Sequence, residues 1–172
     1  IRRNRLTQNP SVLLNKMKRL INRIFLQYDG KTMFIGKPED FTLLCHHLFL
    51  MAGLLGVDLG LAVRKKYPGF CPYCNKTSCQ CGTVKPNFHK RWDGPIPPEG
   101  SIADLQKMLA VIYPPERHTL EHQVKKLLEE IEESREAIRD SALIEVQEVQ
   151  EELADIFARL ASLAHTFKLP LS

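Results

Sequence analysis

The sequence lacks any long apolar run. Of its 172 residues 44% are hydrophobic, yet no segment approaches the ~18 to 20 consecutive apolar residues that a membrane span requires. The basic opening, residues 1–5, is not followed by the apolar core of a signal peptide. We therefore expect a cytoplasmic protein with no membrane partner.

Strand-like alternation of polar and apolar residues is also scarce, and aromatic residues make up only 8% of the chain. Apolar residues instead recur at the spacing of helices that bury one face. Helix starts are marked by Ser11, by Asp58 and by the capping-box pair Ser101 and Asp104. These signals predict an all-α fold, with helices over residues 11–28, 39–55, 58–67, 101–112, 118–139 and 142–167.

The net charge of +4 hides an uneven distribution. Residues 1–90 carry 15 Lys and Arg against 4 Asp and Glu, whereas residues 91–172 carry 9 against 16. A basic segment favours phosphate or nucleic-acid partners, and an acidic segment favours cations or a basic partner. The two halves also have the charges to attract each other.

The two halves share a pattern of apolar positions. Residues 151–171 align with residues 39–59, and residues 125–133 align with residues 18–26. This similarity indicates a tandem repeat of helical hairpins, although any two amphipathic hairpins would align in a similar way. We predict three segments, which are a degenerate helical half at 1–70, a cysteine-rich knuckle with a proline-rich linker at 71–100, and a second helical half at 101–172.

Carboxylates are concentrated in one of the predicted helices. Residues 129–136 hold five glutamates in eight positions beside a single arginine, Arg135. Like charges three or four residues apart each destabilise an isolated helix by roughly 0.2–0.5 kcal/mol. A second acidic pair, Glu152 and Asp155, follows Glu133 after eighteen residues. Such a costly accumulation of like charge suggests a functional site.

A helical hairpin would bring four of these carboxylates together. Glu130 and Asp155 are centred on the same point of the sequence as Glu133 and Glu152. At ~100° per residue, each helix also turns its acidic pair toward the other, roughly 95° to 160° from its apolar stripe. We therefore expect one cluster of Glu130, Glu133, Glu152 and Asp155, with Glu129 beside it.

Carboxylates that converge without basic partners form an all-oxygen site, which suits Mg²⁺ or Mn²⁺. Such ions can bind a triphosphate and activate a water molecule for attack. The alternative is a solvated acidic face, which is the commoner explanation for one Glu-rich helix.

The segments E-E-I-E-E (129–133) and E-L-A-D (152–155) resemble the EExxE...ExxD signature of the MazG-like all-α NTP pyrophosphatase superfamily. The similarity extends over residues 101–167. It implies Mg²⁺-dependent hydrolysis of nucleoside triphosphates between the α- and β-phosphates, giving a monophosphate and pyrophosphate. It also implies that Glu130, Glu133, Glu152 and Asp155 bind the metal, with Glu129 near the attacking water.

The first half resembles a MazG-like hairpin that has lost its acids. Because members of the superfamily build their sites from two hairpins or two subunits, the resemblance implies a homodimer or a pseudo-dimer within one chain. Basic residues of the first half would then contact the substrate phosphates, the alternative being a solvated helix face. These residues are Lys16, Lys18, Arg19 and Arg23.

Four of the five cysteines lie close together as Cys-x2-Cys-x4-Cys-x-Cys. The members are Cys71, Cys74, Cys79 and Cys81. Thiolates at this spacing predict a structural zinc site, in which His89 could replace one cysteine. Cys-Pro-Tyr-Cys also matches a redox motif, but the strand and helix that such a motif requires are not evident.

Two alternatives stay open. Trp92 in the linker can anchor the chain, which is the commoner role, or it can stack on a base. The protein as a whole can also be a non-enzymatic adaptor that is stapled by zinc. Its basic half, including Arg2, Arg3, Arg5 and Arg23, would then bind nucleic acid or an acidic partner.

Overall fold

A computed structural model describes residues 9–28, 30–81, 92–140 and 146–171. Within these residues the chain forms six α-helices, one two-stranded sheet and one short 3-10 turn. In chain order the elements are α1 (Pro10–Ile24), β1 (Phe25–Tyr28), β2 (Lys31–Phe34), α2 (Pro38–Leu54), α3 (Leu59–Lys66), α4 (Ile102–Ile112), η1 (Pro115–Arg117), α5 (Leu120–Asp140) and α6 (Val146–Thr166).

The mostly helical class is confirmed, and α3 and α4 begin where the sequence signals place them. The expected start of α1 is wrong, because Asn9 and not Ser11 caps this helix, and the Asn9 side chain accepts a hydrogen bond from the backbone N–H of Ser11 at 2.9 Å. The Asp58 carboxylate accepts a hydrogen bond from the backbone N–H of Leu61 at 2.9 Å, which caps α3. Ser101 and Asp104 exchange side-chain and backbone hydrogen bonds in a capping box at the start of α4. Both devices satisfy backbone N–H groups that have no partner inside the helix.

The helix expected over residues 11–28 is wrong at its C-terminal end. It stops at Ile24, and the next residues form a hairpin in which Phe25 pairs with Phe34 and Tyr28 with Lys31. Only Asp29 and Gly30 separate the strands, a dipeptide typical of two-residue hairpin turns, and Gly30 has a φ of 69°. The Asp-Gly dipeptide, expected to end the helix, therefore follows β1 instead, and α1 ends before that strand begins.

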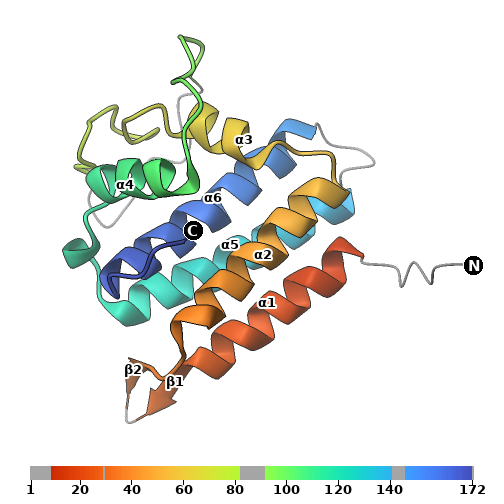
Figure 1. Ribbon diagram of the computed structural model, residues 1–172, viewed down its shortest axis with the longest axis vertical. Helices are drawn as coiled ribbons and strands as arrows, with labels where there is room; N and C mark the ends of the chain where they lie inside the picture. Colours follow the sequence, from red (N-terminus) through yellow and green to blue (C-terminus); the bar gives the residue numbers. More distant parts are fainter. Residues whose placement is uncertain (1–8, 29, 82–91, 141–145, 172) are drawn as a thin grey trace, which may run out of the picture.

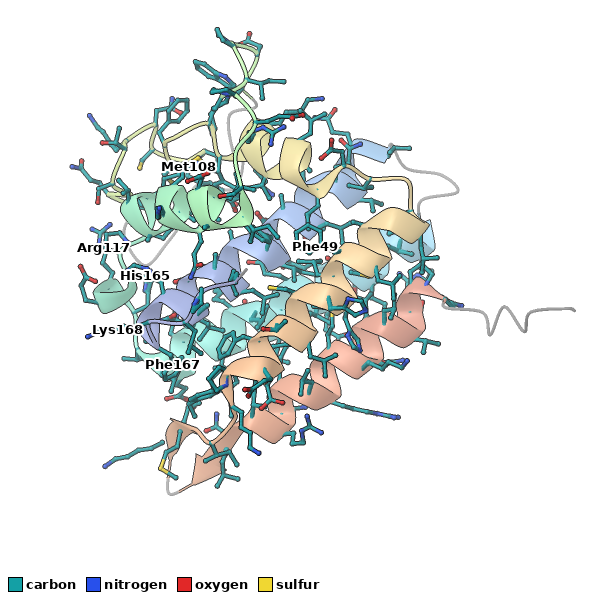
Figure 2. The ribbon with its side chains drawn as sticks, viewed as in Figure 1. Phe49, Met108, Arg117, His165, Phe167 and Lys168 are labelled. Atoms are coloured by element: carbon teal, nitrogen blue, oxygen red, sulfur yellow. The ribbon has the colours of Figure 1, made fainter. Side chains whose placement is uncertain are left out.

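An aromatic cluster explains why the hairpin forms. The rings of Phe25 and Phe34 lie 5.6 Å apart, and Phe34 lies 4.4 Å from Phe167, which follows the end of α6. Phe41 of α2 joins the same cluster and is fully buried. Figure 2 shows Phe167 at the end of α6 that is nearest the hairpin. Packing against residues far along the chain therefore selects strand over helix here.

The helices assemble as two hairpins that lie side by side. Helix α1 packs against α2, and α5 packs against α6 (Figure 1). Contacts of α1 with α5 and of α2 with α6 join the hairpins, and α3 and α4 lie against α6. A single hydrophobic cluster runs through both hairpins. Beside it, the exposed ring of Phe49 of α2, labelled in Figure 2, lies 6.3 Å from the ring of the buried Phe157 of α6. The proposed tandem repeat stays a prediction.

A helix that crosses a membrane must be long and apolar. Among the described residues no single helix meets both requirements, whereas α2 and α3, bent by 98°, meet them only when joined.

A substitution at Gly36, between β2 and α2, tests the packing beside the β1–β2 hairpin. A Cβ atom at this position would lie 2.7 Å from Ile24 Cβ. We expect Gly36→Ala to lower the free energy of unfolding by about 1–3 kcal/mol, because neighbouring groups must shift. Urea unfolding followed by circular dichroism measures the change.

Gly53→Ala, in α2, provides the matched control. Nothing lies within 4 Å of a Cβ atom there, so the higher helix propensity of alanine should raise stability by about 0.5–1 kcal/mol. Equal effects of the two substitutions would contradict the hairpin packing.

Candidate functional site

Three carboxylates converge where α5 packs against α6. Glu130 comes from α5, and Glu152 and Asp155 come from α6. One oxygen from each lies within 4.8 Å of one from each of the others. Glu130 is buried, whereas Glu152 and Asp155 are partly buried. We call these residues the acidic cluster.

Glu133 and Glu129 lie beside the acidic cluster rather than within it. Glu133 is exposed on α5, although its charge contributes to raising the pKa of Glu130 and of Glu152. Glu129 accepts a hydrogen bond from Lys126, which lowers the pKa of the Glu129 carboxyl. Both glutamates line an open groove of about 590 Å³ that also includes Lys18 of α1.

The expectation that the carboxylates converge without basic partners is wrong. Lys66 Nζ donates to Asp155 Oδ2 at 2.7 Å, and Arg159 Nε donates to Glu130 Oε1 at 3.0 Å. The Tyr67 hydroxyl donates to the other oxygen of Asp155. These partners reach the site because α3, from the first half of the chain, packs against α6, and because Arg159 lies one turn after Asp155.

Negative charge in the acidic cluster still exceeds what these cations balance. Burial, followed by the charge of Asp155, raises the pKa of Glu152 to about 8. Burial and the charge of Asp155 also raise the pKa of Glu130 to about 7, despite its contact with Arg159. The buried Glu152 Oε2 has no hydrogen-bond partner. At neutral pH the acidic cluster therefore retains a proton, and a bound cation can take the place of this proton.

The four basic residues predicted to contact phosphates all lie on α1. Lys18 donates to Glu132 at 2.6 Å, and Arg23 donates to Asp40 at 3.1 Å. Lys16 and Arg19 are exposed. The cations that do meet the acidic cluster are instead Lys66 and Arg159, which the sequence analysis missed. The i,i+4 spacing of Asp155 and Arg159 could have placed Arg159 near the acidic cluster, where it bonds Glu130. No residue near Lys66 in the sequence indicates its contact with Asp155.

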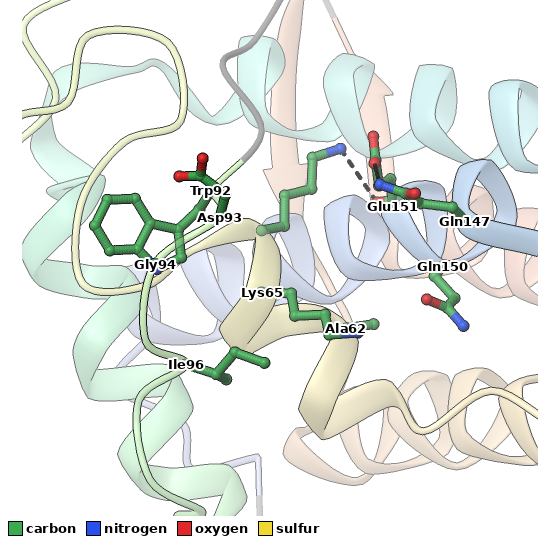
Figure 3. Close-up of a pocket in the computed structure, with 10 residues that line it drawn as sticks. Ala62, Lys65, Trp92, Asp93, Gly94, Ile96, Gln147, Gln150 and Glu151 are labelled. Carbon is green, nitrogen blue, oxygen red and sulfur yellow. Dashed lines mark hydrogen bonds between the residues drawn. The ribbon is translucent and has the colours of Figure 1, made fainter.

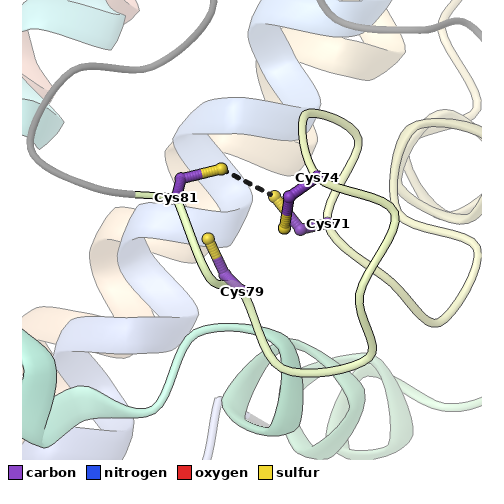
Figure 4. A group of neighbouring side chains, drawn as sticks. All are labelled: Cys71, Cys74, Cys79 and Cys81. Atoms are coloured by element: carbon purple, nitrogen blue, oxygen red, sulfur yellow. Dashed lines mark hydrogen bonds between the residues drawn. The ribbon is translucent and has the colours of Figure 1, made fainter.

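The cysteine cluster assembles as predicted. The sulfur atoms of Cys71, Cys74, Cys79 and Cys81 all lie within 4.8 Å of one another (Figure 4). Cys71 Sγ and Cys81 Sγ are 3.8 Å apart, far longer than a disulfide and close to the ~3.8 Å between sulfurs of a tetrahedral site with Zn–S bonds of ~2.3 Å. His89, the predicted alternative ligand, lies outside the described residues.

The backbone around the cysteines supports ionised sulfur. Burial of Cys74 disfavours its thiolate, but N–H donation from Gln80 and Lys76 outweighs this and lowers the pKa of Cys74 to about 7. Burial raises the pKa of Cys81. Asn75 has a φ of 55°, which turns the chain after Cys74. The four thiols therefore do not ionise together unless a cation such as Zn²⁺ offsets their charge.

The two clusters are neighbours. Tyr113 donates to Cys71 Sγ at 3.5 Å and packs edge-on against Tyr67, the donor to Asp155. Tyr73 lies between Cys71 and Cys74 in the sequence. Burial, followed by the charges of Asp155 and Glu130, raises the pKa of Tyr73 to about 12. The cysteine segment is therefore connected to the acidic cluster through Tyr113 and Tyr67.

Comparisons with protein-family models, with curated proteins and with solved structures find no match for this chain. Function is therefore inferred from the chemistry of the two clusters and from the motif residues.

Metal content tests the cysteine cluster. We expect one zinc ion per chain by elemental analysis, and its removal with a chelator should lower the unfolding temperature. Zinc at 1,000 times its Kd would contribute about 4 kcal/mol to stability. Cys71→Ser should lower the zinc content, whereas Cys45→Ala, in α2 and outside the cluster, should not. Zinc-free protein with unchanged stability would contradict the assignment.

The pH dependence of stability tests the acidic cluster. The raised pKa of Glu152, about 8 against an ordinary 4.5, means that the folded state binds this proton more tightly than the unfolded state. The resulting stability is complete below about pH 4.5 and is lost as pH rises through about 8.

Glu152→Gln should remove part of this loss. In chelator, we expect the variant to lose less stability than the wild type between pH 5 and pH 8.5, by on the order of 1 kcal/mol. Glu148→Gln, at an exposed position of α6, should follow the wild type. Urea midpoints across the pH range measure the difference, and identical profiles for all three proteins would show that Glu152 is not perturbed.

Proposed function

We propose that the protein is a Mg²⁺-dependent nucleoside triphosphate pyrophosphohydrolase. It would cleave NTPs or dNTPs between the α- and β-phosphates and release a nucleoside monophosphate and pyrophosphate. The observation that carries the proposal is the acidic cluster, in which one oxygen of each carboxylate lies within 4.8 Å of one oxygen of each of the others. Its member Glu152 also has a buried oxygen, Oε2, without a hydrogen-bond partner. Hard divalent cations bind such oxygen sets and also bind phosphates.

The chemistry of the acidic cluster fits Mg²⁺ or Mn²⁺ rather than a softer metal, because its ligand atoms are all oxygens. Glu130, Glu152 and Asp155 would hold the ion, with Glu133 as a further proposed ligand. When bound, the ion supplies positive charge that offsets the negative charge developing on phosphoryl oxygens.

The surrounding side chains orient the carboxylates. Tyr67 and Lys66 both hold Asp155, and Arg159 holds Glu130. Burial and the Asp155 charge keep the pKa of Tyr67 well above 10, so its hydroxyl remains a donor. Fixed partners of this kind maintain ligand geometry. Glu129, ionised at neutral pH, is the proposed acceptor for the attacking water, a role that depends on the family resemblance.

The proposed assembly is a pseudo-dimer within one chain, with the α1–α2 hairpin as the degenerate partner of α5–α6. Lys18 supports this idea, because among the four predicted phosphate contacts it is the one that lines the same groove as Glu129 and Glu133. Structural Zn²⁺ at the four cysteines is part of the same proposal. A homodimer stays a prediction.

The activity is tested by incubating the zinc-loaded protein with a panel of NTPs and dNTPs in Mg²⁺. The expected products are nucleoside monophosphate and pyrophosphate, with none formed in EDTA. Glu152→Gln should lower kcat/KM by at least about 100-fold, the upper range for outer partners of a metal. Glu148→Gln is the matched control and should retain activity. Release of orthophosphate and a diphosphate would contradict the proposed cleavage position.

The adaptor would be favoured instead if the wild type and both variants showed no turnover and the wild type bound nucleic acid with an affinity that falls as salt rises. Arg2, Arg3 and Arg5, which favoured that alternative, lie outside the described residues.

A further inference from the structure

A second feature, a pocket of about 460 Å³, borders the acidic cluster (Figure 3). It lies between the end of α3, the linker residues 92–96 and the start of α6. Its polar and aromatic lining comes from Lys65, Lys66, Trp92, Asp93, Gln147, Gln150 and Glu151. This size is within the range of small-molecule sites, ~300–1,000 Å³.

Trp92 is held in a fixed position in this pocket. Its indole Nε1–H donates to the carbonyl of Pro95 at 2.9 Å, and its ring meets Phe70 edge-on at 5.0 Å. The ring also lies against Gly94, where a Cβ atom would come within 2.2 Å of it. Even so, 42% of Trp92 is exposed. The linker therefore both anchors this ring and leaves part of it free for stacking.

Lys66 connects the pocket with the acidic cluster. Its ammonium group donates to the carbonyl of Glu151 at 3.2 Å, drawn as the dashed line in Figure 3, and to Asp155 at 2.7 Å. The same side chain lines the pocket. A ligand that extends from Trp92 past Lys66 would therefore place its far end at the carboxylates.

The remaining lining can recognise an aromatic heterocycle. Gln147 and Gln150 each provide amide donors and an acceptor, and Gln147 is oriented by a 2.9 Å hydrogen bond to Glu151. Lys65 adds a second positive charge beside Lys66. The pocket thus combines an aromatic ring and amides, which suit a base, with ammonium groups, which suit phosphates, beside the carboxylates of Asp93 and Glu151.

We propose that this pocket binds the base of a nucleotide, stacked on Trp92, with its phosphates directed past Lys66 toward the acidic cluster. The proposal depends on the proposed function for the fate of the phosphates, but binding of the base can be measured without turnover.

Trp92 is the only tryptophan in the chain, so its fluorescence reports directly on the pocket. We expect saturable quenching by the nucleoside monophosphates AMP, CMP, GMP or UMP in Mg²⁺. Inorganic tripolyphosphate, which has no base, should leave the fluorescence unchanged. Quenching by tripolyphosphate to the same extent, or no quenching by any monophosphate, would overturn the proposal.

Substitutions at Trp92 separate stacking from folding. Trp92→Ala should raise the Kd for the preferred monophosphate, measured by calorimetry, by roughly 5- to 150-fold, the range expected for one stacked base. Trp92→Phe retains an aromatic ring and should recover most of the affinity. Gly94→Ala, which displaces the indole ring, should weaken binding without altering Trp92 itself. Equal affinity for wild type and Trp92→Ala would refute stacking.

Glu152→Gln distinguishes failure of the pocket from failure of the proposed activity. This variant should lose hydrolysis but keep fluorescence quenching by the monophosphates. Quenching without hydrolysis in the wild type would support the pocket and refute the activity, whereas hydrolysis without quenching would do the reverse.

Discussion

An imbalance of charge at the junction of α3, α5 and α6 is the constraint on which the account depends. Three carboxylates and two cations meet there, and burial makes full ionisation of the carboxylates unfavourable. The fold maintains this junction by packing both hairpins into one core. Lys66 and Arg159 offset part of this repulsion, and under the proposed function a divalent cation would offset the rest with the ligand type that the site offers.

The cysteine segment extends this junction instead of merely joining two halves. Tyr113 connects Cys71 with Tyr67, and Tyr67 in turn holds Asp155. Because the cysteines lie between α3 and the linker, their geometry also bears on the placement of Trp92 against Phe70. The cysteine segment, the acidic cluster and the pocket are therefore physically contiguous.

Local signals predicted much of this structure, and long-range contacts decided the rest. Capping at Asp58 and Ser101 was readable because a cap involves only three or four residues. The meeting of Glu130 with Glu152 and Asp155 followed from helical periodicity. The hairpin was missed because its two strands are stabilised by packing of Phe25 and Phe34 against Phe167, which lies far along the sequence. Lys66 was unpredictable for the same reason, since its partner Asp155 is 89 residues away.

The most direct test of the account is a crystal structure of the protein with Mn²⁺, located by anomalous scattering. The account predicts a peak among the oxygens of Glu130, Glu152 and Asp155, about 2.2 Å from its ligands as for comparable oxygen-bound ions, with Lys66 and Arg159 still oriented on their carboxylates. A map with no peak there in saturating Mn²⁺ would show that the acidic cluster is a structural ion-pair network.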